Sequence, residues 1–271
     1  MKKSKWYNKT LFVGLTIVGV MVFMALFRSW VIPYDPFHQE MENALKGVSW
    51  EHPLGTDEFG RDIMCRVIYG ARTTLAIVFS SVLIGGVIGC LLGIISGYSG
   101  KYVDAIIMRV MDIPLAFPGM LLALAIVQIV GKGAMGLIIA TSIYSVPQFA
   151  RLVRACILTE RDRLYVQGAR ALGESHFNII RLYILPNIWA SILVLASIRA
   201  AIVILVTCAL SFLGVGIQPP LPEWGAMIAA GKMYLVRAPH LMLFPGLAIA
   251  ITVFGFNLIG DALRDITDVK L

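Results

Sequence analysis

Four charged residues lie close together in a glycine-bearing stretch: Asp57, Glu58, Arg61 and Asp62. Neighbouring carboxylates can act as a general acid and a general base when their surroundings separate their pKa values. Here an arginine stands among them, and glycines occur within the same stretch. Turn formation and ion pairing account for this pattern, so we predict a structural role for these residues and not a catalytic one.

Candidate nucleophiles are the serines of the apolar runs, including Ser80, Ser81 and Ser142. A serine nucleophile needs a base within hydrogen-bond reach, most often a histidine. None of the histidines lies inside a long apolar run. We therefore expect that the chain is not an enzyme.

The histidines and cysteines do not have the spacing of a metal site. His38, His52 and His240 are scattered and share no ligand spacing. We predict no bound metal and a loop-structural role for His52. The cysteines match no redox or zinc motif and are expected to pack as small apolar residues; they are Cys65, Cys90, Cys156 and Cys208.

Arg199 stands in the middle of an apolar run. A charge at mid-bilayer costs at least about 2.5 kcal/mol, and such residues usually face a cavity or a partner. One hypothesis is that Arg199 lines a solute path and attracts an anionic group such as a peptide carboxylate. The alternatives are an ion pair to a partner chain, or a span shifted so that Arg199 lies nearer an interface.

The composition places these residues in a membrane protein. The chain has 271 residues, of which 58% are hydrophobic and 14% charged, and its mean hydropathy is +0.82. Soluble domains carry about 25% charged residues. The net charge of +7 comes from basic residues that cluster at the ends of apolar runs, which is typical of membrane topology and lipid headgroups and not of nucleic-acid binding.

Apolar runs predict six transmembrane spans, since each needs about 20 residues. The stretch between the fifth and sixth runs, Ser211 to His240, is rich in Gly and Pro and is expected to be partly re-entrant or at the surface. The predicted spans are Leu11 to Phe27, a run between Arg72 and Lys101, Ile113 to Gly131, Lys132 to about Ala150, Pro186 to Leu210, and Leu241 to Ile259.

Basic residues are more numerous in the segments on the N-terminal side of the predicted membrane than on the other side. This bias predicts that both termini are cytoplasmic. We divide the chain into residues 1–72, which hold the N-terminal tail, the first span and an outer loop, and residues 73–271, a five-helix core carrying a cytoplasmic loop at 151–185.

That inner loop has a helical rhythm of apolar residues up to Leu172, followed by Gly173, which terminates helices well. Glu174 or Ser175 can cap a second helix over residues 177–185. Two short helices around a glycine would form a compact projection. It is either a coupling element that docks a cytoplasmic partner or an ordinary basic loop.

Gln167-Gly168-Ala169 is followed by Gly173 and then by Leu185-Pro186. This order and spacing resemble the Glu-Ala-Ala loop of importer permeases in the ABC transporter superfamily, with Gln for Glu and Gly for the first Ala. The resemblance implies that the loop couples the chain to an ATPase. The implied coupling residues are Gln167, Gly168, Ala169, Ala171, Leu172, Gly173 and Glu174.

Three further stretches narrow the resemblance to the dipeptide, oligopeptide and nickel permease group. The stretch from His52 to Arg72 resembles the loop after the first span, the stretch from Ser211 to Gly225 resembles the loop after the fifth span, and Gly260 to Asp265 resembles the C-terminal ending. The length and N-terminus suit the second, C-type permease of the pair. The outer-loop residues that match are His52, Gly55, Asp57, Gly60, Arg61, Asp62, Gln218, Pro219, Pro220 and Trp224.

The resemblance implies an all-α, six-helix permease of the type I importer fold that transports peptides across the plasma membrane. It implies a homologous second permease, two ATP-binding subunits and an extracytoplasmic solute-binding protein. The chain has no Walker motif, so ATP-Mg is expected on the partner subunits and no cofactor on this chain. The group often has Glu at position 207, where Thr207 implies a changed charge pattern in the path beside Arg199.

Nickel or metal-chelate uptake is the alternative within the same group. A secondary transporter or channel, or an intramembrane enzyme, is the alternative from another class. A channel or secondary transporter would leave the coupling-type loop without a role, and an enzyme would need the paired acids or span histidines that the runs lack.

Overall fold

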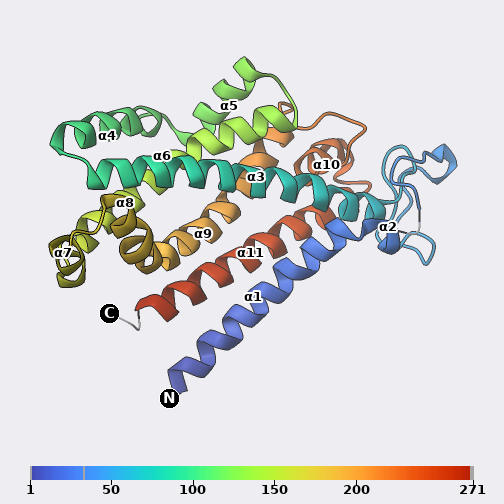
Figure 1. Cartoon of the computed structure of the whole chain (residues 1–271). Helices are drawn as coiled ribbons and strands as arrows, with labels where there is room; N and C mark the ends of the chain where they lie inside the picture. The colour runs from blue at the N-terminus through green and yellow to red at the C-terminus, as the bar shows by residue number, and fades with distance from the viewer. Residues whose placement is uncertain (1, 33, 269–271) are drawn as a thin grey trace.

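The computed structural model describes residues 2–32 and 34–268. Figure 1 shows a helical bundle, which confirms the predicted all-α polytopic class. Five helices are long and apolar enough to cross a bilayer, or six spans result if one bent pair counts as a span. The five are α1 (Lys2–Leu26), α3 (Ile63–Tyr98), α6 (Ala134–Glu160), α9 (Leu185–Phe212) and α11 (His240–Asp268).

The shorter elements lie in the connections. They are α2 (Arg28–Val31), the 3-10 turns η1 (Met41–Asn43) and η3 (Lys232–Tyr234), α4 (Lys101–Leu115), α5 (Gly119–Val130), α7 (Leu164–Ala171), α8 (His176–Asn178), the π-helical η2 (Ile179–Ile184) and α10 (Trp224–Gly231).

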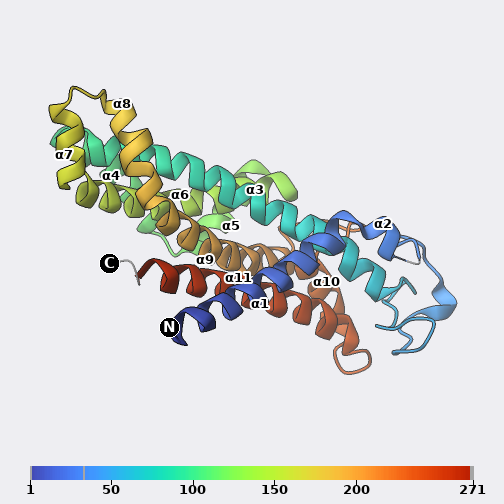
Figure 2. The same ribbon diagram turned by 60° about the horizontal axis from the view of Figure 1, so that its bottom comes forward.

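Small residues let α3 and α6 approach closely. Gly85, Gly89 and Gly93 of α3 are buried, and their backbone faces α6. A Cβ on Gly89 would lie 2.6 Å from the Val146 carbonyl oxygen, and one on Gly93 would lie 2.7 Å from that of Ala150. On the other side of the bundle, α11 packs between α9 and α1 (Figures 1 and 2).

The predicted span from Ile113 to Gly131 is not one continuous helix. The region forms two helices, α4 and α5, whose axes bend by 90° at a break of three residues. Pro118 follows Phe117 at the break, and a residue before proline is disfavoured in the helical conformation. Pro114 is accommodated inside α4, one turn before the break.

The predicted boundaries also need correction at two other places. Helix α3 begins at Ile63, before the predicted start after Arg72, and α6 continues to Glu160, beyond the predicted end near Ala150. Leu152, Val153 and Ile157 continue the apolar pattern, and the last two are buried. The first ten residues of the expected loop 151–185 are therefore helix.

The stretch after α9 does not lie wholly at the surface, because it contains α10, whose first residue Trp224 is fully buried. The start of α1 and the end of α11 lie at the same end of the bundle as α7 and α8 (Figures 1 and 2). The loop that joins α2 to α3 lies at the opposite end, near α10. The two ends of the bundle therefore carry different segments of the chain.

Candidate functional site

Residues 161–184, here called the inner knob, project at the end of the bundle where the two ends of the described chain lie (Figure 2). Gly173 has φ of +82° and ends α7, as predicted. Its N–H donates to the Arg170 carbonyl at 3.0 Å, and the Glu174 N–H donates to the Ala169 carbonyl at 3.1 Å. These two bonds define a Schellman motif.

The predicted second helix is present in altered form. Ser175, one of the two predicted caps, accepts a hydrogen bond from the Asn178 N–H at 3.2 Å. The helix then runs through the π-helical η2 directly into α9, so it begins at His176 and does not end before Pro186. π-Helical turns are rare and often occur at functional sites.

The inner knob is fastened to the bundle by one apolar side. Val166 and Ala169 of α7 are buried against the core cluster that includes Ile179 and Ile184. The Asn187 amide donates to Tyr165 Oη at 3.1 Å, and Tyr165 donates to the Glu160 carboxylate. Desolvation raises the pKa of Tyr165, and this bond to Glu160 acts in the same direction.

The other side of the inner knob is exposed and apolar. Leu172 is 87% exposed and Phe177 69% exposed. Of the coupling residues implied by the resemblance, Ala169 is buried, Glu174 is half-buried and bonds the Asn178 amide at 2.9 Å, and the rest are exposed. The exposed ones are Gln167, Gly168, Ala171, Leu172 and Gly173.

Arg199 lies near the centre of α9, with 4% of its surface exposed. Its Nη2 lies 3.4 Å from Ser145 Oγ, and its Cζ lies 4.6 Å from the centre of the Tyr144 ring. Its Nε has no hydrogen-bond partner, and no carboxylate of the described residues pairs with it. Arg199 is thus a buried cation without an intrachain counter-ion.

Two hydroxyls further along α9 are also unpaired. Thr207 Oγ1 and Ser211 Oγ are buried and have no hydrogen-bond partner within 2–32 and 34–268. They lie four positions apart, on one face of the helix. Among the described residues, four buried side-chain atoms have no hydrogen-bond partner, and three of them belong to α9. Such groups are uncommon and mark α9 as the polar helix of the bundle interior.

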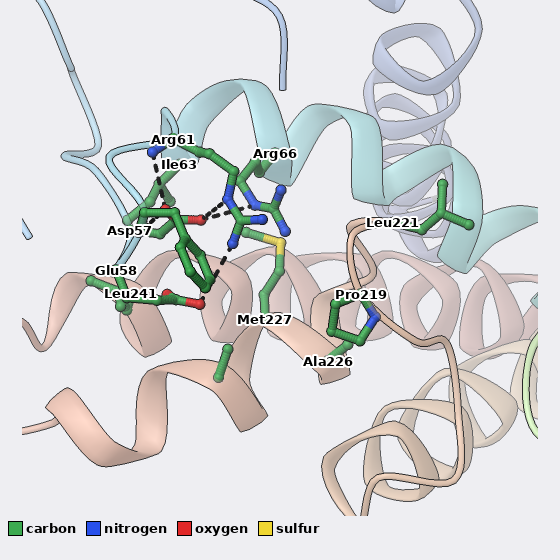
Figure 3. A pocket seen from close by; sticks show the side chains of 12 residues that line it. Asp57, Glu58, Arg61, Ile63, Arg66, Pro219, Leu221, Ala226, Met227 and Leu241 are labelled. Atoms are coloured by element: carbon green, nitrogen blue, oxygen red, sulfur yellow. Dashed lines mark hydrogen bonds and ion pairs between the residues drawn. The ribbon is translucent and has the colours of Figure 1, made fainter. Parts of the chain in front are cut away.

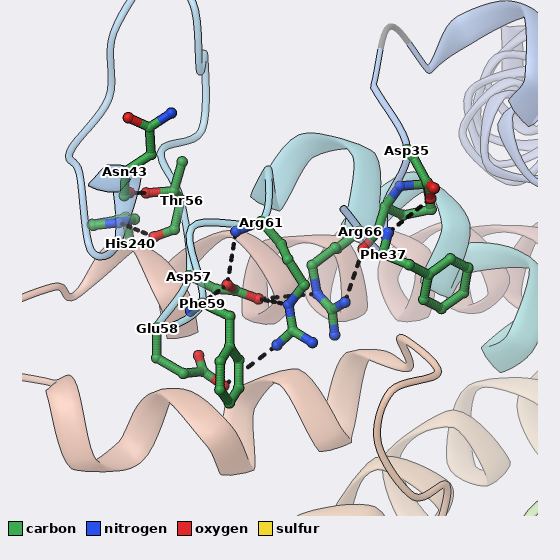
Figure 4. A network of polar contacts seen from close by, with 11 residues as sticks. Asp35, Phe37, Asn43, Thr56, Asp57, Glu58, Phe59, Arg61, Arg66 and His240 are labelled. Atoms are coloured by element: carbon green, nitrogen blue, oxygen red, sulfur yellow. Dashed lines mark hydrogen bonds and ion pairs between the residues drawn. The ribbon is translucent and has the colours of Figure 1, made fainter. Parts of the chain in front are cut away.

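At the opposite end, two sequence-predicted loop motifs meet in what we call the outer junction: Asp57, Arg61, Asp62, Arg66, Glu223 and Trp224. Asp57 Oδ2 lies 2.6 Å from Arg61 Nε and 3.3 Å from Arg66 Nε (Figure 4). All three side chains are buried. A pocket beside them is lined from the other loop by Pro219 and Leu221, and by Met227 of α10 (Figure 3).

The remaining residues of the first motif shape this loop. His52 Nδ1 lies 2.9 Å from Asp62 Oδ2, while Asp62 Oδ1 accepts from the Cys65 N–H at 2.8 Å and caps α3. The structural roles predicted for His52 and the acids agree with these contacts. Gly60 has φ of +74°, and a Cβ there would lie 2.6 Å from the Glu40 carbonyl carbon. Gly55 has a similar φ of +80°.

The residues of the second motif divide into an exposed group and a buried one. Gln218, Pro219 and Pro220 are exposed, and the Gln218 amide donates to the Gly216 carbonyl at 2.9 Å. Trp224 is buried and its Nε1 donates to the Val67 carbonyl at 2.9 Å. Across the described parts of the chain, no group of three or more His, Cys, Asp or Glu residues is placed to hold a metal ion.

The sequence analysis missed Glu223, which is fully buried. Its carboxylate accepts from the N–H groups of Gly225 at 3.0 Å and Ala226 at 2.9 Å and so caps α10. Thr74 Oγ1 donates to it at 3.4 Å from α3. Glutamate is not among the residues that N-caps prefer, so the sequence carries no cap signal at this position.

A multi-pass helical bundle with a polar interior helix and a projecting knob is typical of a membrane transport component. The family model described as "Binding-protein-dependent transport system inner membrane component" matches residues 89–271. The model "N-terminal TM domain of oligopeptide transport permease C" matches residues 7–47. The chain belongs to the binding-protein-dependent permeases of ABC importers, which confirms the resemblance inferred from its motifs.

Curated relatives extend over almost the whole chain. A di/tripeptide transport system permease protein DppC of Pseudomonas aeruginosa is 44% identical over 98% of this chain and 89% of its own length. A glutathione transport system permease protein GsiD of Pectobacterium atrosepticum is 43% identical over 95% and 86%. A dipeptide transport system permease protein DppC of Alkalihalophilus pseudofirmus is 42% identical over 97% and 87%.

Solved structures support the fold. A chain of the MetNI methionine ABC transporter in an inward-facing conformation superposes with a TM-score of 0.62. It is 20% identical and covers 77% of this chain and 98% of its own. A chain of an amino acid ABC transporter crystallised with histidines gives a TM-score of 0.57 at 20% identity, with 77% and 95% covered. The predicted type I importer permease fold is confirmed.

Proposed function

We propose that this protein is one of two permease subunits of an ATP-driven importer of small peptides. The observation that carries the proposal is the 44% identity, over 98% of the chain, to a permease named for di- and tripeptides. Relatives named for dipeptides and for glutathione, itself a small peptide, favour the same solute class. They do not favour the nickel alternative.

The energy for transport comes from other chains. The partners are a homologous second permease, two ATP-binding subunits carrying ATP-Mg, and an extracytoplasmic solute-binding protein. The exposed apolar side of the inner knob, with Leu172 and Phe177, supports this assignment, because such a patch in an otherwise packed element marks a contact surface. The chain itself binds no cofactor in this scheme.

Coupling residues Gln167 to Glu174 transmit closure of the ATPase dimer to the bundle. Arg199 and Thr207 lie on α9 and contribute to the solute path between the two permeases. The support for the path is that Arg199 Nε and Thr207 Oγ1 are buried without a hydrogen-bond partner, in a helix long and apolar enough to cross the bilayer.

The chain resides in the plasma membrane with both termini cytoplasmic. The two ends of the described chain lie at the end that carries the inner knob (Figure 2). The excess of basic residues on that side favours the same orientation. The predicted division after residue 72 falls inside α3, so the appended span and outer loop end at Asp62 and the permease core begins at Ile63.

The test is purification of the tagged chain from native membranes in mild detergent, with mass spectrometry of what accompanies it. We expect a second permease and ATP-binding chains. The complex, reconstituted with its binding protein, should take up labelled dipeptide only when ATP is supplied on the cytoplasmic side. Purification of the chain alone, with flux in liposomes that needs no ATP, would instead support a channel or secondary transporter.

A further inference from the structure

Arg199 is one part of a larger arrangement at the middle of the bundle. Its guanidinium lies under the Tyr144 ring, with Cζ 4.6 Å from the ring centre. The hydroxyl end of that ring contacts the start of α5, because a Cβ on Gly119 would lie 2.9 Å from Tyr144 Oη. The N-terminus of α5 therefore contacts Tyr144, which in turn contacts Arg199.

The N-terminus of α5 is free to bind an anion. The first N–H groups of a helix have no acceptor within the helix, and the helix dipole adds partial positive charge there. Pro118, in the N-cap position, makes no side-chain cap. The break at residues 116–118 is exposed, so these N–H groups lie at the surface of the chain and not in its packed interior.

Arg199 gives independent support for an anionic ligand. It is 4% exposed and its Nε has no partner. The nearby acid Asp112, one turn before the break, is engaged by Arg151 at 2.6 Å. A buried arginine without a counter-ion is costly, and a bidentate carboxylate is the ligand that its planar guanidinium fits best.

We propose that Arg199, Tyr144 and the N-terminal N–H groups of α5 form a binding site for the carboxylate of the transported solute. The inference rests on the proposed importer function and specifies its substrate as a peptide with a free C-terminus. The N-termini of discontinuous membrane helices are suited to anionic groups of solutes. Tyr144 covers Arg199 here, so its ring must move aside for the carboxylate to reach the guanidinium.

The test compares Ala-Ala with its C-terminal amide as labelled probes. The complete importer with its binding protein is reconstituted in proteoliposomes, and initial ATP-dependent uptake of each probe is measured. We expect Arg199→Gln to lower the ratio of free-acid to amide uptake by about tenfold or more, the loss of a charged hydrogen bond. The same binding protein serves the wild-type and Arg199→Gln complexes, so its own preference between the two probes cancels when their uptake ratios are compared.

Two variants separate recognition from structure. Tyr144→Phe keeps the ring over Arg199 and removes the hydroxyl, so the ratio should fall about threefold to tenfold, the loss of one hydrogen bond. Arg154→Gln removes an arginine of α6 that pairs with Asp104 at the inner end of the bundle. It should lower uptake of both probes equally and leave the ratio unchanged.

An unchanged ratio in Arg199→Gln and Tyr144→Phe would overturn the site. If Arg199→Gln does not assemble and Tyr144→Phe leaves the ratio unchanged, the arginine pairs with a carboxylate of the second permease and the proposal is wrong. Failure of the importer function appears differently, as absence of ATP-dependent uptake of either probe by the wild-type complex.

Discussion

In the outer junction, buried charged side chains satisfy one another within the chain, whereas in the inner knob large apolar side chains lie exposed. Asp57, Arg61 and Arg66 are each no more than 6% exposed. Leu164 and Leu172 of the inner knob are 85% and 87% exposed. The outer junction is therefore complete within the chain, whereas the exposed side of the inner knob supports the proposal that another chain docks there.

The largest effect on stability is expected from Asp57→Ala. Its carboxylate is the shared partner of Arg61 and Arg66, so its loss leaves two buried guanidinium groups without their main carboxylate. Arg61 keeps a 3.5 Å contact with Glu58, and Arg66 keeps its 3.0 Å hydrogen bond to the Pro36 carbonyl. Breaking such a buried pair costs about 3–5 kcal/mol. Thermal unfolding of the purified complex should show this loss. The control Asp162→Ala, whose side chain is 76% exposed, should leave the midpoint unchanged.

Glu223→Ala should have the next largest effect. It removes the cap of α10 and leaves the Gly225 and Ala226 N–H groups and Thr74 Oγ1 without their acceptor. We expect a loss of about 2 kcal/mol in the free energy of unfolding. Glu223→Gln keeps one acceptor oxygen and should lose about half as much. Equal stability of wild type and Glu223→Ala would refute the cap.

Gly173 and Gly168 offer a matched pair in the inner knob. Gly173→Ala forces a side chain into φ of +82° and should destabilise the knob by about 1 kcal/mol. Gly168 lies inside α7 with no atom within 4 Å of an added Cβ, so Gly168→Ala should stabilise the helix by about 1 kcal/mol. Hydrogen exchange of residues 164–178 should become faster in the first variant and slower in the second.

Leu172→Ser should have the smallest effect on the chain itself. An exposed side chain makes few contacts, so the free energy of unfolding should change by less than about 0.5 kcal/mol. Retention of the ATP-binding subunits during purification should nevertheless fall. Leu213→Ser, an exposed leucine beyond the outer end of α9, is the control and should retain them. Full retention in Leu172→Ser would remove this residue from the contact.

The sequence predicted what depends on local pattern. Apolar runs revealed the bundle, Gly173 marked a helix end because its left-handed conformation suits glycine, and Arg199 stood out as a charge within a span. The end of α6 was misplaced because Arg151 and Arg154 seemed to mark the membrane boundary. In the structure these arginines lie on a continuing helix and pair with Asp112 and Asp104 of α4.

Other features could not be predicted because they depend on packing between distant segments. Pro114 and Pro118 are compatible with either one kinked span or two separate helices. The packing of α5 against α6 favours the 90° break. The Pro-rich stretch around Glu223 looked like surface. Its burial depends on Thr74, which is 149 positions away. The sequence likewise gives no indication of a role for Tyr144, because its contact with Arg199 forms only when α6 and α9 pack together.

The helical path from His176 to Phe212 is unbroken, although it passes through the π-helical η2, and it joins the inner knob to Arg199. Phe177 and Arg199 are 22 positions apart, which corresponds to about 33 Å along a helix. A tilt of about 10° pivoting at the knob would displace the guanidinium by about 6 Å over that length. This is comparable with the 4.6 Å between Cζ and the Tyr144 ring, so a small angular movement of this helix would change how Tyr144 covers the arginine.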